Sequence, residues 1–176
     1  GHAARVALFR FLDRIMVFQI RPSRDSDLAA VDALLARSYP KLLKADYPPS
    51  VLVTALPIIS RARPELVGCG SYYVAEEEGR IIGAGGWTRD GRRADLGHIR
   101  HVVTDDRAVR RGVGRAILSH AIGAARAAGI SELECWSTRT AEPFYAAMGF
   151  AAEGPMEVSL APAVRFPAVR MRLRLA

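Results

Sequence analysis

The chain has 176 residues and a formal net charge of +7, and half of its residues are hydrophobic. This length suits one domain with a sizeable core, and no apolar run is long enough to span a bilayer, so a helical membrane protein is excluded. The positive charge is almost all arginine and favours an anionic partner, which is a nucleic acid, a membrane surface or a phosphorylated small molecule.

The segment before Met16 differs from the rest of the chain. Met16 opens the stretch 'MVFQIRPSRDSDL', which reads as a natural beginning, whereas Gly1-His2 resembles a scar left by expression. We therefore interpret residues 1–15 as an N-terminal extension or an expression-derived segment. Residues 16–176 contain no linker-like stretch and are expected to form a single domain.

Hydrophobic periodicity predicts a strand, a helix and then an irregular region after Met16. The strand covers 18–21, and Asp25 or Ser26 is expected to cap a helix with apolar residues at helical spacing from Leu28 to Leu35. Prolines at positions 40, 48, 49, 57 and 64 are expected to break the next stretch into short helical pieces and loops.

The rest of the chain predicts a sheet with two helices. The expected strands are 71–75, 80–87, 96–104, 132–136, 158–160 and 169–173, and the first two form a hairpin. The expected helices are 112–128, which ends at Gly129, and 140–148, which has Pro143 in its first turn and ends at Gly149. This order of elements indicates a mixed α/β domain.

A glycine turn stands at the start of the first of these helices. Arg110 and Arg111 run into Gly112-Val113-Gly114, and Arg115 follows. The first backbone N–H groups of a helix have no partner inside it, they lie at the positive end of its dipole, and glycine lets a ligand approach them closely. Because guanidinium groups suit phosphate oxygens, the turn predicts an anion site, best matched by a pyrophosphate.

Two common phosphate motifs are excluded at this turn. A dinucleotide fingerprint needs a third glycine at position 117, which is Ile117, and a Walker loop needs G-K where Ile117-Leu118 stand. An ordinary strand-to-helix turn, in which glycine only permits tight packing, remains the alternative for this motif alone.

A second motif, 'AEPFYAAMGF' from Ala141 to Phe150, makes an ordinary turn the less favoured interpretation. Together with 'RRGVGRAIL' and the preceding 'HIRHVVT', it resembles the GCN5-related N-acetyltransferase (GNAT) superfamily from Met16 to about Leu175. The resemblance implies a V-shaped, mixed and mostly antiparallel sheet flanked by helices. It also implies acetyl-CoA as the acetyl donor, entering between the strand that contains Val102 and the strand that begins at Glu132.

The resemblance assigns cofactor contacts to particular residues. The backbone of Val102, Val103 and Thr104 is expected to pair with the pantetheine arm and the thioester carbonyl. The pyrophosphate is expected at the glycine turn, which comprises Arg110, Arg111, Gly112, Val113, Gly114 and Arg115. Two positions depart from the family pattern. Val109 replaces a usual Gln or Arg, for which Arg110 or Arg107 compensates, and Thr138 stands where an Asn is frequent.

Acetyl transfer to an amine needs a base, an oxyanion donor and an acid. Resemblance implies that Tyr145 is the acid near the cofactor sulfur, with a packing role as the alternative. It implies that His98 is the base, with a water chain as the alternative and His101 in reserve. The backbone N–H of Val103 or a neighbour is expected to stabilise the oxyanion.

Strand alternation orients these candidates. It is expected to place His98, Arg100 and Val102 on one face and Ile99, His101 and Val103 on the other until a bulge intervenes. Aromatic residues are weaker candidates for an acceptor pocket; they are Tyr39, Tyr47, Tyr72, Tyr73 and Trp87.

Cysteine and histidine spacing gives no metal site. Cys69 and Cys135 lie far apart and are expected to be reduced, partly buried thiols of a cytoplasmic protein. The histidines are His2, His98, His101 and His120. None of them has metal-ligand spacing, and His120 is expected on the surface.

The sequence therefore predicts an acetyl-CoA-dependent N-acetyltransferase with a small-molecule or peptide amine as acceptor. A non-catalytic acetyl-CoA-binding sensor of the same fold is the first alternative. A nucleic-acid-binding protein is the second, and it lacks a basic stripe interleaved with aromatics. No nucleic-acid or membrane partner is expected, and a homodimer remains open because many relatives dimerise.

Overall fold

Residues 18–175 of the computed structural model form a seven-stranded sheet in the order β1-β2-β3-β4-β5-β7-β6. The strands are β1 (Gln19–Pro22), β2 (Tyr72–Glu77), β3 (Arg80–Arg89), β4 (Leu96–Thr104), β5 (Glu132–Ser137), β6 (Ala151–Ala161) and β7 (Val164–Arg174). The helices are η1 (Asp25–Asp27), α2 (Leu28–Leu43), α3 (Pro49–Ile59), α4 (Pro64–Val67), α5 (Val113–Ala127) and α6 (Glu142–Ala147). The expected extension at 1–15 lies outside the described residues. None of the helices in 18–175 is long and apolar enough to cross a bilayer.

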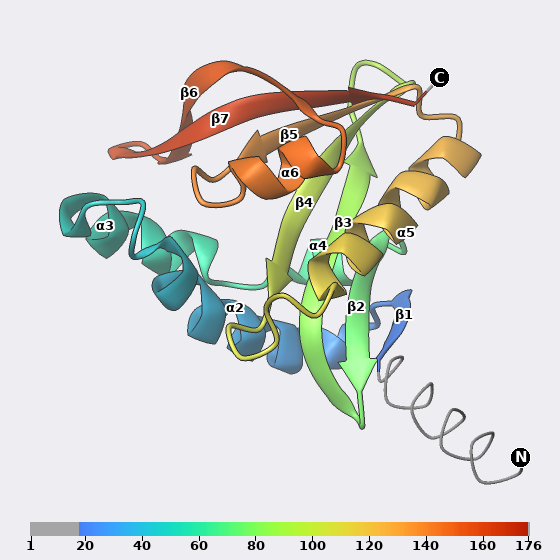
Figure 1. Cartoon of the computed structure of the whole chain (residues 1–176), viewed down its shortest axis with the longest axis horizontal. Coiled ribbons are helices and arrows are strands. Elements are labelled where there is room, and N and C mark those ends of the chain that lie inside the picture. The colour runs from blue at the N-terminus through green and yellow to red at the C-terminus, as the bar shows by residue number, and fades with distance from the viewer. Residues whose placement is uncertain (1–17, 176) are drawn as a thin grey trace, which may run out of the picture.

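Helices cover both faces of the first arm of the sheet, which comprises β2, β3 and β4 (Figure 1). On one face, α5 buries a stripe at helical spacing that includes Ile117, Ala121 and Ala125. On the other face, Val31 and Leu35 of α2 join a cluster that reaches residues of β2, β3 and β4. Burial of these apolar stripes fixes the arm between two helices.

The two arms of the sheet meet at β4 and β5, the parallel pair. The pairing consists of Leu96 with Glu132, Gly97 with Leu133 and His98 with Glu134. Beyond His98 both strands continue without pairing to each other, β4 as far as Thr104 and β5 as far as Ser137. Figure 1 shows β5, β6 and β7 turning away from β2, β3 and β4. The predicted mixed, mostly antiparallel V-shaped sheet flanked by helices is thus confirmed.

The proline-rich region is more regular than the sequence predicted. Pro49 and Pro64 begin α3 and α4, where a missing N–H costs nothing. Pro40 and Pro57 lie inside α2 and α3, so the expectation that they break the chain into short pieces was wrong. The buried face of α2, which includes Leu34 and Leu43, offsets the cost of an interior proline, about 3 kcal/mol.

Two other local expectations also failed. Neither Asp25 nor Ser26 caps α2; they belong to the turn η1, and the Asp27 carboxylate accepts the Arg24 N–H at 2.8 Å. β6 begins at Ala151 rather than at 158. Its first half contains Gly154 and Pro155, which resemble a loop but are tolerated on an edge strand paired only with β7.

Candidate active site

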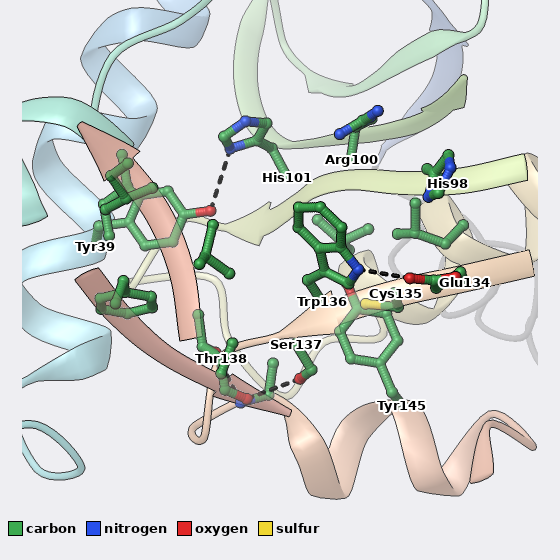
Figure 2. Close-up of a pocket in the computed structure, with 18 of the residues that line it drawn as sticks. Tyr39, His98, Arg100, His101, Glu134, Cys135, Trp136, Ser137, Thr138 and Tyr145 are labelled. Atoms are coloured by element: carbon green, nitrogen blue, oxygen red, sulfur yellow. Dashed lines mark hydrogen bonds between the residues drawn. The ribbon is translucent and has the colours of Figure 1, made fainter. Parts of the chain in front are cut away.

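A cavity of about 290 Å³ lies where β4 and β5 separate (Figure 2). Its walls include Tyr39 of α2 and Tyr145 of α6. Tyr39 packs against the cluster under α2, whereas Tyr145 packs with residues of α5 on the opposite face of the sheet. The cavity therefore lies in the gap between the strands and has walls from both faces of the sheet.

A bulge interrupts β4 at this gap. Ala84 of β3 pairs with Val103 and Gly86 pairs with Arg100, so two residues of β4 lie opposite Gly85. One of them, His101, has φ 46°, in the left-handed region that non-glycine residues rarely adopt. Such strain persists only where surrounding structure enforces it, and it is frequent at functional sites.

The bulge changes which side chains share a face. Ile99 and Val102 pack on the α5 side, whereas His101 contacts Tyr39 on the α2 side. Regular alternation, expected only as far as a bulge, would have placed Val102 on the face of His98 and Arg100. The bulge falls at His101, which takes that place instead. In Figure 2, His98, Arg100 and His101 all project from β4 along one rim.

His98 is paired with an acidic residue that the sequence analysis did not single out. Its Nε2 atom lies 2.8 Å from Oδ1 of Asp90, in the turn after β3. This hydrogen bond holds the pKa of Asp90 at about 2, so Asp90 is a carboxylate and only accepts. The His98 proton is therefore held on Nε2, which leaves the Nδ1 lone pair of a neutral ring free. The hairpin register was the missing signal, since Thr88 lies opposite His98 and Asp90 follows shortly after.

His101 has a drier and more positive environment. Burial, together with the nearby charges of Arg63 and Arg100, lowers its pKa to about 4. Its Nδ1 atom lies 3.5 Å from the Tyr39 hydroxyl, at the limit of a hydrogen bond. His101 is thus neutral at physiological pH, but it is a weak base.

Arg100 and Arg63 add positive charge on the same face. The Arg100 side chain is partly buried, and its Nε donates to Thr88 Oγ1 at 2.9 Å. Burial lowers the pKa of Arg100, and the neighbouring charge of Arg63 adds to this effect. Arg63 directly precedes α4 and pairs with Glu65 through Nε at 2.9 Å.

Tyr145 and Cys135 meet on the α5 side of the cavity. Tyr145 is 4% exposed and Cys135 is 3% exposed. Burial raises the pKa of the Tyr145 hydroxyl well above its ordinary value. Burial also raises the pKa of the Cys135 thiol, to about 12, although the Tyr145 hydroxyl partly opposes this effect. Both groups keep their protons at neutral pH. Cys69, by contrast, is exposed, so the expectation of two partly buried thiols was wrong for both.

Residues from β5 form the wall opposite β4. The Trp136 side chain is 47% exposed, and its Nε1 donates to Glu134 Oε1 at 2.6 Å. Glu134 is buried and also accepts from Arg172 at 3.2 Å. Thr138 Oγ1 accepts the Ala141 N–H at 3.1 Å, at the approach to α6. Its lone pairs are thus partly engaged within the chain.

The glycine turn lies at the start of α5, after the end of β4. Gly112 has φ 80°, and no side chain caps the helix. A Cβ on Gly114 would lie 3.2 Å from Thr104 Oγ1 and 3.5 Å from the Phe144 ring. The first-turn N–H groups are therefore uncapped, and a larger side chain at 114 would crowd the space in front of them.

The arginines of this turn differ in their partners. Arg111 is paired with Glu77, and Arg107 is held by Asp105 through Nη2 at 3.0 Å. Within residues 18–175, Arg110 and Arg115 have no carboxylate partner. Arg110 and Arg115 are therefore better placed than Arg111 to contact an anion at the turn.

The other aromatic candidates do not meet the cavity. Tyr47, Tyr72, Tyr73 and Trp87 are buried in the hydrophobic core, and Tyr39 alone of the expected set lines the cavity. Among the described residues no group of His, Cys, Asp or Glu side chains has the arrangement of a metal site.

Comparison with known proteins gives the family. The model of the acetyltransferase (GNAT) domain matches residues 59–174, which is more than half of the chain. The chain belongs to the GNAT acetyltransferase family. A search of curated protein sequences gave no significant match. The family model spans β2 to β7, which carry the cavity, and the family predicted from the sequence motifs is confirmed.

Solved structures share the GNAT fold at low sequence identity. A GCN5-related N-acetyltransferase from Rhodopseudomonas palustris is 21% identical, covers 89% of this chain and 95% of its own, and has a TM-score of 0.73. The PaiA N-acetyltransferase from Thermoplasma acidophilum, in complex with coenzyme A, is 14% identical over 89% and 98%, with a TM-score of 0.69. Rv2747 from Mycobacterium tuberculosis, in complex with CoA and NLQ, is 22% identical over 90% and 99%, with a TM-score of 0.58.

The low pKa of His101 predicts a pH-dependent stability. The unfolded chain takes up a proton near pH 6.5, whereas the folded ring resists it until about pH 4, so stability falls as the pH falls through this window. From pH 7 to pH 4, the free energy of unfolding should drop by roughly 2–3 kcal/mol more in the wild type than in His101→Gln.

Urea unfolding at several pH values measures this difference. His120→Gln is the matched control, because it removes an imidazole whose side chain is exposed on α5. Equal pH dependence in the wild type and in His101→Gln would show that His101 is not desolvated in the fold.

Proposed function

We propose that the protein is an acetyl-CoA-dependent N-acetyltransferase that acts on the amine of a small molecule or a peptide. The cavity that crosses the sheet carries this proposal. Tyr145, a proton donor, lines it from the α5 face, and His98, which is paired with Asp90, lines it from the other face. The coenzyme A complexes of PaiA and Rv2747 support the same ligand here.

The glycine turn fits the pyrophosphate of acetyl-CoA. Its helix dipole and uncapped N–H groups favour an anion, and Gly114 keeps the approach to them open. Arg110 and Arg115 would add charged contacts, and Gly112 and Val113 would contribute backbone donors. Arg111 would first have to leave Glu77.

The free edge of β4 fits the pantetheine arm. After His98, β4 has a ladder partner on its β3 side only, so the backbone groups of Val102, Val103 and Thr104 that face β5 have no strand partner. A backbone N–H at Val103 or a neighbour would then stabilise the developing oxyanion. Thr138, on the β5 side of the cavity, would contact the arm.

Acetyl-CoA, when bound, supplies an activated thioester whose C–S bond breaks as the amide N–C bond forms. His98 accepts the proton of the attacking amine on Nδ1, because Asp90 holds the other ring proton on Nε2. The carboxylate also stabilises the imidazolium that results.

Tyr145 protonates the departing sulfur. Its high pKa keeps the hydroxyl protonated across the physiological range, so the proton is always available. The neutral Cys135 thiol beside it does not compete as a nucleophile, because its own pKa is about 12.

The Asp90–His98 pair favours catalysis over a non-catalytic sensor of acetyl-CoA. A sensor has no need for a carboxylate that fixes the tautomer of a histidine in the wall of the cavity. A nucleic-acid binder is disfavoured because Arg63 and Arg100 line a cavity and do not form an extended basic surface.

Gly114→Leu tests the cofactor site. The added side chain would enter the space beside Thr104 and Phe144 and block the first-turn N–H groups, so CoA affinity should fall at least roughly 10- to 100-fold. Gly123→Leu is the matched control on the same helix, because a Cβ there meets nothing within 4 Å. Calorimetry with CoA measures both, and unchanged affinity in Gly114→Leu would refute the cofactor assignment.

Tyr145→Phe tests the acid. The variant removes one hydroxyl and little volume, so CoA should bind as before while turnover falls by roughly 10²- to 10⁴-fold. Stopped-flow and steady-state measurements of CoA release separate the two effects. Wild-type turnover throughout the pH range would reduce Tyr145 to a packing residue.

His98→Gln tests the base. The acidic limb of the kcat/KM profile should disappear or move, activity at neutral pH should fall, and cofactor affinity should stay nearly unchanged. Asp90→Asn should lower kcat/KM without removing the limb, since it disturbs only the tautomer. A limb lost in His101→Gln but intact in His98→Gln would assign the base to His101 instead.

A further inference from the structure

Arg100 is a cation without a counter-ion beside the acceptor side of the cavity. It is partly buried, and Nε is satisfied by Thr88 Oγ1 at 2.9 Å, which leaves its two terminal nitrogens available. Within residues 18–175 it forms no ion pair; its charged neighbour is Arg63, another cation. A guanidinium in such a place is costly unless an anion joins it.

A second, smaller cavity adjoins Arg100. Its volume is about 110 Å³, and it lies between Thr88 and Arg100 on one side and α4 with the preceding Arg63 on the other. Arg63 and Arg100 line both this cavity and the larger one. The two arginines therefore form the cationic border between the larger cavity and a side pocket.

The carboxylates that line the two cavities are already paired. Glu65 is paired with Arg63, and Glu134 accepts from Trp136 and Arg172. Among the described lining residues, no free carboxylate remains to hold a second ammonium group. This distribution disfavours polyamines and other polycations as acceptors.

The strand register brings Arg100 close to the proposed base. Thr88, to which the Arg100 side chain is tethered, is the cross-strand partner of His98. The Cα atoms of directly opposed residues in antiparallel strands lie about 4.5–5.5 Å apart. In addition, the side chains of His98 and Arg100 project from the same face of β4. One small molecule can therefore reach the imidazole and the guanidinium together.

We propose that the acceptor is a small amine that also carries a carboxylate, bound by the Arg100 guanidinium while its amine faces His98. This proposal rests on the acetyl transfer proposed above. The remaining walls on this side are apolar and include Ile59, Leu160 and Phe166. An amino acid with an apolar side chain matches the charges and the walls of the cavity. Arg100 is then the residue that determines specificity.

Matched acceptors test the proposal. Leucine, phenylalanine and methionine are compared with their primary carboxamides, and spermidine and O-phosphoethanolamine complete the panel. The wild type should acetylate the carboxylates with kcat/KM roughly 10- to 100-fold above the amides, the span of one charge-assisted hydrogen-bonded pair. Arg100→Gln should bring this ratio to about 1, because kcat/KM falls for the amino acids and stays the same for the carboxamides. The KM for acetyl-CoA should not change.

Arg126→Gln, which removes an exposed guanidinium from the last turn of α5, should keep the wild-type ratio. Equal rates on acids and amides, a ratio that survives Arg100→Gln, or a preference for spermidine or O-phosphoethanolamine would overturn the proposal and leave acetyl transfer intact. The wild-type comparison stands even if Arg100→Gln fails to fold.

If no amine in the panel is acetylated, the proposed function is refuted instead. The carboxylate site is then measured directly, by calorimetry of N-acetyl-leucine and N-acetyl-leucinamide in the presence of CoA. Tighter binding of the acid in the wild type and not in Arg100→Gln supports the site, and equal binding of the two overturns it.

Discussion

The separation of β4 and β5 is the constraint on which the rest of the site depends. Two parallel strands that paired along their whole length would close the sheet and leave no passage. Here the pairing ends at His98 and Glu134, and the two strands then follow different partners, β3 and β7. The backbone groups left unpaired on β4 would be costly in a dry core, so they need water or a ligand in the gap. The open edge is therefore both an architectural cost and the basis of the proposed cofactor site.

The bulge at His101 decides what each face of this gap contains. Without it, His101 would point toward α5, and Val102 would occupy the acceptor side. With it, Arg100 and His101 lie on one face in succession, while Ile99 and Val102 fill the α5 side. The left-handed backbone of His101 costs on the order of 1–3 kcal/mol, which the packed strands on either side maintain. One inserted residue thus places Arg100 and His101 together on the α2 side and keeps Val102 on the α5 side.

The sequence predicted most of the architecture, because hydrophobic periodicity and the residues that begin and end helices act over short stretches of the chain. The glycine turn, the helix after it and the hairpin before it all follow from spacing, and the family motifs fixed the sheet. The features that the sequence did not predict depend on packing between residues far apart in the chain. Pro40 continues a helix because α2 has a buried face, and Gly154-Pro155 form a strand because β7 pairs with them. In the site, the Asp90–His98 pair depends on hairpin register, and the direction of His101 depends on where the bulge falls; neither is encoded in composition or spacing.

The net positive charge of the sequence favoured an anionic partner of any kind, and the fold shows where the unpaired part of this charge lies. Much of it is neutralised internally: Arg172 alone contacts three glutamates, and Asp105 holds Arg107. Among the described residues, cations without a carboxylate partner occupy two separate places near the site: Arg110 and Arg115 lie at the glycine turn, and Arg100 lies beside the cavity. A nucleic acid would need an extended basic surface. Two separate cationic positions, one at the glycine turn and one beside the cavity, fit two separate anions instead, and the proposed reaction needs both of them bound at once.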